Sequence, residues 1–92
     1  MRESELQTKC IKYLKNKGYY VLNQHGGGWG NKGCPDLIAC IKGKFVAFEL
    51  KVGENRMHVD QAIHKNLIEE SGGDHHLVRS IEQLKEIIDY YE

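Results

Sequence analysis

The feature that most constrains the fold is a pair of apolar segments joined by a short polar turn. Residues 36–41 and 45–51 are rich in aliphatic and aromatic side chains, and Lys42-Gly43-Lys44 separates them. Two such segments around a glycine-containing turn predict a β-hairpin, because glycine readily adopts the positive φ angles that tight hairpin turns require. We therefore expect a sheet that is built around this hairpin.

The register of this hairpin determines which charged side chains meet. A two-residue turn at Lys42-Gly43 would place Asp36 directly opposite Glu49. A turn at Gly43-Lys44 would instead place Asp36 opposite Lys51, with Glu49 on the diagonal. Side chains two residues apart on a strand share one face, so both registers bring the three charged groups together. A three-residue loop without a bulge would turn Asp36 to the other face.

Helical periodicity and turn residues predict the remaining elements. Ser4 and Gln7 have capping-box spacing at the start of a first helix, and Ser80 and Gln83 have it at the start of the last. We expect helices at about residues 3–17, from Val59 to a stop at Gly72-Gly73, and at 81–91, with short strands at 19–22 and 76–78. The resulting order is α-β-β-β-α-β-α, an α/β domain whose mixed sheet is flanked by helices.

Length and composition exclude several classes of protein. With 92 residues, 40% hydrophobic and 28% charged, the chain fits a single folded domain over residues 1–92. Its 13 basic and 13 acidic residues balance, so any nucleic-acid contact must be local. Three cysteines without a CxxC pair argue against a disulfide framework. The five histidines, His75 among them, and the cysteines lack the paired spacings of a structural zinc site, so we expect core or surface roles for them. No segment suits a membrane span or a signal peptide, so we expect a cytoplasmic protein without a membrane partner.

The carboxylates of Asp36 and Glu49 would repel each other across the hairpin, because like charges opposite each other destabilise a sheet. A bound cation would offset this repulsion. Hard oxygen ligands favour Mg²⁺, which keeps several waters and leaves positions open for a substrate phosphate, and we expect Mn²⁺ to substitute for it. Lys51 could then orient the attacking water, share its proton, or stabilise charge on the phosphoryl oxygens. The alternative is that Glu49 and Lys51 are ordinary charges on a solvated strand face and that Asp36 merely follows a turn proline.

The combination of these residues resembles a known nuclease motif. Pro35-Asp36 and, after a gap of twelve residues, Glu49-Leu50-Lys51 lie on a hairpin that follows a helix, as in the PD-(D/E)xK nuclease superfamily. The lead-in from Gly33 to Asp36 and the presence of Gln61 ten residues after Lys51 are similar to its virus-type replication-repair nuclease (VRR-Nuc) family. The resemblance covers nearly the whole chain and implies a restriction-endonuclease-like core.

The resemblance also implies roles for individual residues. In that family an aspartate and a glutamate on the two strands hold the metal, which correspond here to Asp36 and Glu49. The lysine that assists hydrolysis corresponds to Lys51, and the supporting glutamine of the following helix corresponds to Gln61. The backbone carbonyl between glutamate and lysine, here that of Leu50, often completes the metal shell.

The family further places an acidic residue of the first helix near the metal. Glu3 lies fifteen residues before Gly18, which matches the family spacing, and we expect it to be this residue. Glu5 is the rival candidate. Both are also the kind of acidic residue that the dipole of a helix favours in its first turn, whether or not a metal is nearby.

The glycine-rich segment from Gly26 to Gly33 contains the spacing GxGxxG of dinucleotide-binding loops. Pro35 and a strand follow it where that motif requires a helix, so we expect no nucleotide cofactor. Exposed amides together with Lys32, Trp29 and, at the mouth of the segment, His25 suit contact with a nucleic-acid backbone or an unstacked base. Trp29 could equally anchor the loop or contact a second copy.

Taken together, the motif and the resemblance predict a Mg²⁺-dependent nuclease that hydrolyses DNA phosphodiester bonds and leaves a 5′-phosphate. By analogy with four-way-junction resolving enzymes of the same superfamily fold, we expect a homodimer that cleaves branched DNA such as Holliday junctions. A compact nuclease of this type fits DNA repair or replication in a bacteriophage or mobile element. The alternatives are a non-catalytic nucleic-acid-binding module on the same fold and a structural accessory protein, neither of which would cleave DNA.

Overall fold

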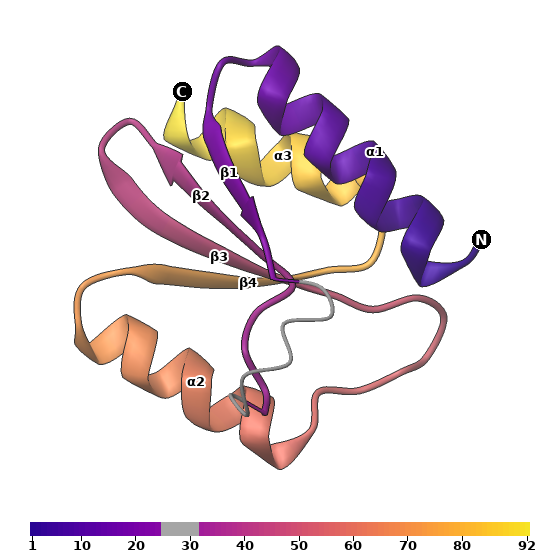
Figure 1. The fold of residues 1–92 in the computed structure, drawn as a ribbon, viewed down its shortest axis with the longest axis vertical. Helices are drawn as coiled ribbons and strands as arrows, with labels where there is room; N and C mark the ends of the chain where they lie inside the picture. The colour runs from indigo at the N-terminus through magenta and orange to yellow at the C-terminus, as the bar shows by residue number, and fades with distance from the viewer. Residues whose placement is uncertain (25–31) are drawn as a thin grey trace.

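A computed structural model describes residues 1–24 and 32–92 of the chain. Its centre is a four-stranded sheet in the order β1-β2-β3-β4, formed by Tyr20–Asn23, Leu37–Ile41, Lys44–Leu50 and Asp74–Val78. Helices α1 (Glu3–Asn16) and α3 (Ile81–Tyr91) lie on one side of the sheet, and α2 (Val59–Glu70) lies on the other (Figure 1). The sequence prediction of a mixed sheet flanked by helices in the order α-β-β-β-α-β-α is confirmed.

The hairpin adopts the first of the two registers that the sequence allowed. Ile41 pairs with Lys44 and Leu37 pairs with Phe48, which makes Lys42-Gly43 a two-residue turn. Both turn residues have positive φ, 53° at Lys42 and 82° at Gly43, as the tight turns that suit a twisted hairpin require. Asp36, one residue before the first pair of this ladder, therefore comes opposite Glu49.

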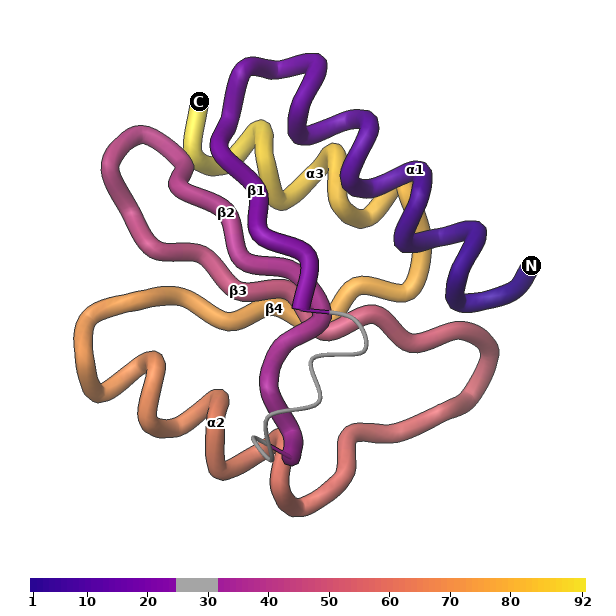
Figure 2. Tube along the Cα trace, viewed as in Figure 1, coloured from indigo at the N-terminus to yellow at the C-terminus, as the bar shows by residue number. Residues whose placement is uncertain are grey.

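Strand β4 completes the sheet through a crossover. It runs parallel to β3, with His75 beside Ala47 and Leu77 beside Glu49. Parallel neighbours need a long connection, which α2 supplies. In the chain trace, residues 51–58 lead from the end of β3 to the start of α2, and α2 runs back to the start of β4 at the other end of the sheet (Figure 2).

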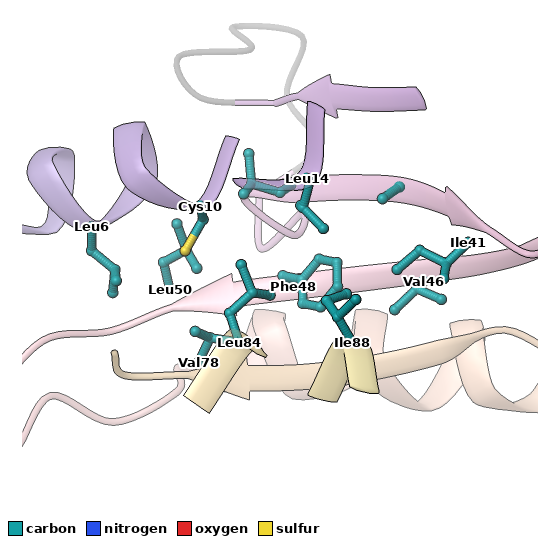
Figure 3. Packing of buried hydrophobic residues seen from close by; sticks show 12 residues of the cluster. Leu6, Cys10, Leu14, Ile41, Val46, Phe48, Leu50, Val78, Leu84 and Ile88 are labelled. Atoms are coloured by element: carbon teal, nitrogen blue, oxygen red, sulfur yellow. The ribbon is translucent and has the colours of Figure 1, made fainter. Parts of the chain in front are cut away.

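The hydrophobic core lies between the sheet and the pair α1 and α3 (Figure 3). Alternate strand residues face it, and Phe48 is the largest fully buried side chain. From the helices, Leu6, Cys10 and Leu14 of α1 and Leu84 and Ile88 of α3 complete the cluster. This burial raises the pKa of the Cys10 thiol to about 11, and all three cysteines are free.

The two predicted helix caps had different outcomes. Ser80 caps α3, since its hydroxyl accepts a hydrogen bond of 3.1 Å from the Gln83 amide, as expected. The capping box predicted from Ser4 and Gln7 is wrong, because α1 already begins at Glu3 and its N-cap Arg2 makes no side-chain cap. Gln7 is instead buried, and its side chain donates a hydrogen bond of 2.6 Å to the Asn23 carboxamide oxygen. The side chain that was predicted to cap α1 thus connects α1 to β1.

Helix α2 forms where the sequence predicted it but does not bury its apolar stripe. Val59, Ile63 and Leu67 recur at helical spacing, yet they are 77%, 50% and 56% exposed. The helix covers the β3 and β4 part of the sheet and has no buried residue of its own. Among the described residues, no helix is long and apolar enough to cross a membrane.

Candidate active site

Three of the predicted site residues, Asp36, Glu49 and Gln61, lie together at the sheet face beneath α2. Alternation along β3 turns Val46, Phe48 and Leu50 to the hydrophobic core, and so turns Glu49 to the opposite face. Lys51 follows one residue after the strand and is 8% exposed, while its backbone N–H continues the pairing to the Val78 carbonyl at 3.0 Å. Lys51, a largely buried basic residue, thus lies two residues from the buried acidic residue Glu49.

Asp36 is held at this face by contacts at both its backbone and its side chain. Its carboxylate Oδ2 accepts a hydrogen bond of 2.8 Å from the backbone N–H of Leu50. Its own carbonyl accepts one of 2.9 Å from Gln24, which ties it to the end of β1. The half-buried carboxylate of Asp36 is therefore fixed beside Glu49 rather than free to move in solvent.

Glu49 is a fully buried acidic residue with neighbours on two sides. Oε2 accepts a hydrogen bond of 3.0 Å from the Gln61 carboxamide, and Oε1 lies 3.6 Å from Nε2 of His75. Burial raises the pKa of the Glu49 carboxyl above its usual range, and the charge of Asp36 raises it further, while His75 opposes the shift. The negative charge of the Glu49 carboxylate is therefore poorly solvated, and a bound cation would stabilise it.

Gln61 connects the site to the start of α2. Its side-chain oxygen accepts from the backbone N–H of His58 at 2.8 Å, while its side-chain nitrogen donates to Glu49. One carboxamide therefore caps the helix and orients the glutamate at the same time. The sequence predicted the supporting role through resemblance alone, and the capping role was missed.

The structure distinguishes the two acidic candidates on α1 by their positions. Glu3 is four residues from Gln7, and side chains at this spacing share one face of a helix. Gln7 reaches Asn23 at the site end of β1, whereas Glu5 lines a separate surface hollow with Thr8 and Lys9. Both glutamates are exposed, and among the described residues no three His, Cys, Asp or Glu side chains converge as a metal site. Glu3 as a metal ligand stays a prediction.

The predicted nucleic-acid contacts lie on the segment before Pro35. His25 and Trp29 are outside the described residues. Lys32 is described, with its side chain 87% exposed and its ammonium 3.6 Å from the Asp60 carboxylate. The backbone carbonyl oxygen of Lys32 lies 3.1 Å from Nε2 of the His64 ring. Lys32 therefore lies beside the first turns of α2, next to the site.

Two buried polar residues near the site were missed as site residues. Gln7 occupies a position in the apolar stripe of α1. A polar side chain in such a stripe is the sequence signal that could have identified Gln7 as a buried residue with a specific partner. His75 has no comparable signal, because its neighbour Glu49 is distant in sequence and reaches it only through the parallel pairing of β3 and β4. Sequence reasoning assigned His75 only a core or surface role.

Comparisons with known proteins identify the family and the fold of the chain. The family model described as archaeal Holliday junction resolvase (Hjc) matches residues 2–85 of the chain. A solved structure titled VRR_NUC domain superposes with a TM-score of 0.81 at 21% identity, covering 98% of this chain and 97% of that one. No curated protein sequence matches. Family and fold place the chain among the PD-(D/E)xK nucleases, as the hairpin motif indicated, and the chain belongs to the archaeal Holliday junction resolvase (Hjc) family.

Proposed function

We propose that this nuclease is a Mg²⁺-dependent endonuclease that cleaves branched DNA, with the four-way junction as its substrate. The observation that carries the proposal is the placement of Asp36 and Glu49 across one hairpin, with Lys51 on the same sheet face. Membership of a family described as Holliday junction resolvases supports the branched substrate. The chain has no net charge, so recognition of DNA has to come from local groups beside this site.

The donor set fits a hard divalent cation. Oε1 of Glu49 is buried and has no hydrogen-bond partner in the described part of the chain, which is costly for a charged oxygen. Asp36 offers a second carboxylate beside it, and Mg²⁺ is typically held by one or two carboxylates with water and phosphate in the remaining positions. Asp36, Glu49 and the Leu50 carbonyl would hold the ion, with Glu3 as an additional acidic group. When bound, Mg²⁺ or Mn²⁺ supplies positive charge that lowers the pKa of a water and polarises the phosphate.

The remaining groups of the site position and stabilise the reacting atoms. Gln61 holds Glu49 in place, so that the carboxylate does not rotate away from Asp36. The ammonium of Lys51, a residue only 8% exposed, can orient the attacking water, share its proton, or stabilise charge on the phosphoryl oxygens. Each of these roles requires the side chain to be held close to the scissile phosphate, and the low exposure of Lys51 at the end of β3 restricts its movement.

Cleavage of labelled DNA tests this function directly. We expect the wild-type protein with Mg²⁺ to nick an end-labelled four-way junction symmetrically, to leave 5′-phosphates, and to leave plain duplex intact. Lys51→Ala removes the cationic group, and Asp36→Ala removes a carboxylate. Each is expected to lower the single-turnover rate by about 10³-fold or more, because each removes a charge that acts on the transition state. EDTA should have the same effect.

A surface lysine supplies the matched control. Lys17→Ala removes an ammonium group that pairs with Glu92 at 2.9 Å, on the outside of the molecule. It should leave the cleavage rate within about twofold of wild type, since the charge is solvated and distant from the site. If no DNA is cleaved while the junction still shifts in a gel, the protein is a binding module and the catalytic proposal is wrong.

We also propose that the active form is a homodimer, built through an uncovered apolar surface. This apolar face comprises exposed and half-buried side chains on β1, β2, β3 and α2: Tyr20, Leu22, Ile38, Phe45 and Leu67. Two adjacent hollows share Phe45. One is lined by Tyr20, Leu22 and Ile38, and the other by Leu67. The apolar face is therefore continuous from β1 to α2.

The size and charge of the apolar face fit a second copy of this chain. Tyr20, Phe45 and Leu67 are 68%, 48% and 56% exposed, and with side chains of roughly 200 Å² the face presents on the order of 400 Å². This is near the largest patch that monomers usually expose, and about half of the ~800 Å² that each partner buries in a standard interface. Two neutral chains do not repel each other, and a twofold axis places the same face on itself.

Two tyrosines provide a matched test of this interface. Tyr20 lies in the apolar face, and Tyr90, 83% exposed on α3, lies outside it. By light scattering after gel filtration we expect the wild type and Tyr90→Lys to have twice the 10.6 kDa mass of one chain. Tyr20→Lys should give the mass of a single chain, because burying an unpaired ammonium in the interface is unfavourable. Equal masses for the two variants would contradict the assignment of this face.

A further inference from the structure

A buried histidine adjoins the glutamate of the site from the side opposite Asp36. Asp36 precedes β2, whereas His75 belongs to β4, so the two flank Glu49 on β3 from either side. The side chains of both His75 and Glu49 have no exposed area, and Nε2 of His75 lies 3.6 Å from Oε1 of Glu49. None of the predicted roles uses this histidine.

The hydrogen-bonding state of this pair argues against a purely structural role. Oε1 of Glu49 and both ring nitrogens of His75 are buried without a hydrogen-bond partner among the described residues. A buried polar group without a partner lowers stability, so an aliphatic side chain would fill this position of β4 more favourably. Oε1 of Glu49 and Nε2 of His75 are complementary groups and lie 3.6 Å apart.

His76, the next residue along β4, is a histidine whose role is structural. His76 points to the opposite side of the sheet, where its ring stacks on Phe48 at a centroid distance of 6.0 Å. Its Nε2 lies 2.7 Å from the Tyr91 hydroxyl, which connects β4 to the end of α3. These contacts account for His76 through packing and hydrogen bonding, whereas no such contact accounts for His75.

We propose that His75 is a positioning residue for Glu49, an inference that rests on the proposed metal site. Its ring N–H is aimed at Oε1 while Gln61 donates to Oε2, so the carboxylate is held from both sides toward Asp36. The role requires a proton on Nε2, which both the neutral Nε2–H tautomer and the imidazolium carry. The gap of 3.6 Å exceeds a hydrogen bond by a few tenths of an ångström, which a small rotation of either side chain closes.

The proposal predicts a loss of metal affinity without a loss of stability. Groups that orient a metal ligand typically contribute 10- to 100-fold in affinity. His75→Leu keeps the approximate volume of the side chain but removes the N–H donor, so we expect the dissociation constant for Mn²⁺ to rise by about 10- to 100-fold. His75→Gln retains an N–H near the position of Nε2 and should remain within about threefold of wild type.

The experiment is a calorimetric titration of Mn²⁺ into each protein without DNA, together with thermal unfolding in EDTA. His76→Leu is the control for a histidine on the same strand, and we expect it to lower the unfolding temperature with the Mn²⁺ affinity unchanged. Equal affinities for wild type, His75→Leu and His75→Gln would overturn this inference and leave the proposed function intact. A wild-type protein that binds no Mn²⁺ would overturn both. Should His75→Leu fail to fold, His75→Gln and His75→Met provide the same contrast between donor and no donor.

Discussion

Glu49→Gln is expected to lower cleavage of junction DNA by about 10³-fold or more while the metal-free protein stays at least as stable as the wild type. The carboxylate is fully buried, and the ring of His75 lies 3.6 Å from it without a hydrogen bond. A charge that is buried without a full complement of partners destabilises a fold, so an uncharged group of the same shape removes this cost. The same substitution removes a ligand of the metal. Activity and stability should therefore change independently.

The pKa of Glu49 gives this prediction a pH dependence. Burial raises its pKa in the folded protein above the unfolded value of about 4.3, so the folded state binds more protons between the two values. Wild-type stability should thus fall as pH rises through this interval and stay level above it, whereas the Glu49→Gln variant lacks this contribution. We expect the stability difference in favour of the variant to grow from pH 4 upward and then to plateau.

Urea unfolding in EDTA at several pH values measures this difference. Glu92→Gln is the control, because Glu92 is exposed and its pKa is lowered by the Tyr19 hydroxyl and by Lys17. A group with a lowered pKa stabilises the fold above its unfolded pKa, so this variant should be slightly less stable than wild type at neutral pH. A Glu49→Gln protein that is clearly less stable than wild type in EDTA at pH 7 would contradict the prediction.

The hairpin and its charged face could be predicted because they follow from local rules. A two-residue turn fixes the register, and the period of two along a strand fixes the face, so the sequence alone predicts that Asp36 and Glu49 meet. The order of the elements followed from periodicity and glycine stops. These features depend on residues within about fifteen positions of one another.

The features that the sequence did not predict depend on contacts between distant elements. Gln7 was assigned to a cap by local spacing, but its contact with Asn23 arises from the packing of α1 on β1. The apolar stripe of α2 looked like a core-facing stripe, yet the helix covers only part of the sheet and leaves Leu67 exposed. His75 reaches Glu49 through parallel strands whose pairing no local pattern encodes.

Gly33→Ala is expected to destabilise the protein by about 3–5 kcal/mol, more than any other glycine-to-alanine change in the described part of the chain. Gly33 has a φ of +89°, and a Cβ there would lie 2.5 Å from the backbone carbon and 2.6 Å from the carbonyl oxygen of Asp60. These are backbone atoms in the first turn of α2, which cannot yield as a flexible side chain would. The glycine thus allows the segment before Pro35 to lie directly against the helix.

Gly18→Ala separates strain in the backbone from the collision with α2. Gly18 has nearly the same φ, +88°, but a Cβ there would meet no atom within 4 Å. Its substitution should cost only the strain of a left-handed residue, about 1–2 kcal/mol. Urea unfolding of the two variants therefore measures the collision as their difference. Equal losses of stability would show that α2 moves aside freely.

The steric clash that Gly33→Ala creates with α2 should also change the active site. Asp60 adjoins Gln61, whose carboxamide donates to Glu49 at 3.0 Å, so a shift of the first turn of α2 moves the group that holds the carboxylate. Misplacement of a positioning group by about 1 Å typically costs on the order of 100-fold in rate. We therefore expect folded Gly33→Ala protein to cleave at least tenfold more slowly than Gly18→Ala protein under conditions where both are folded. Unchanged cleavage by Gly33→Ala would mean that the contact between this segment and α2 supports the fold without positioning Glu49.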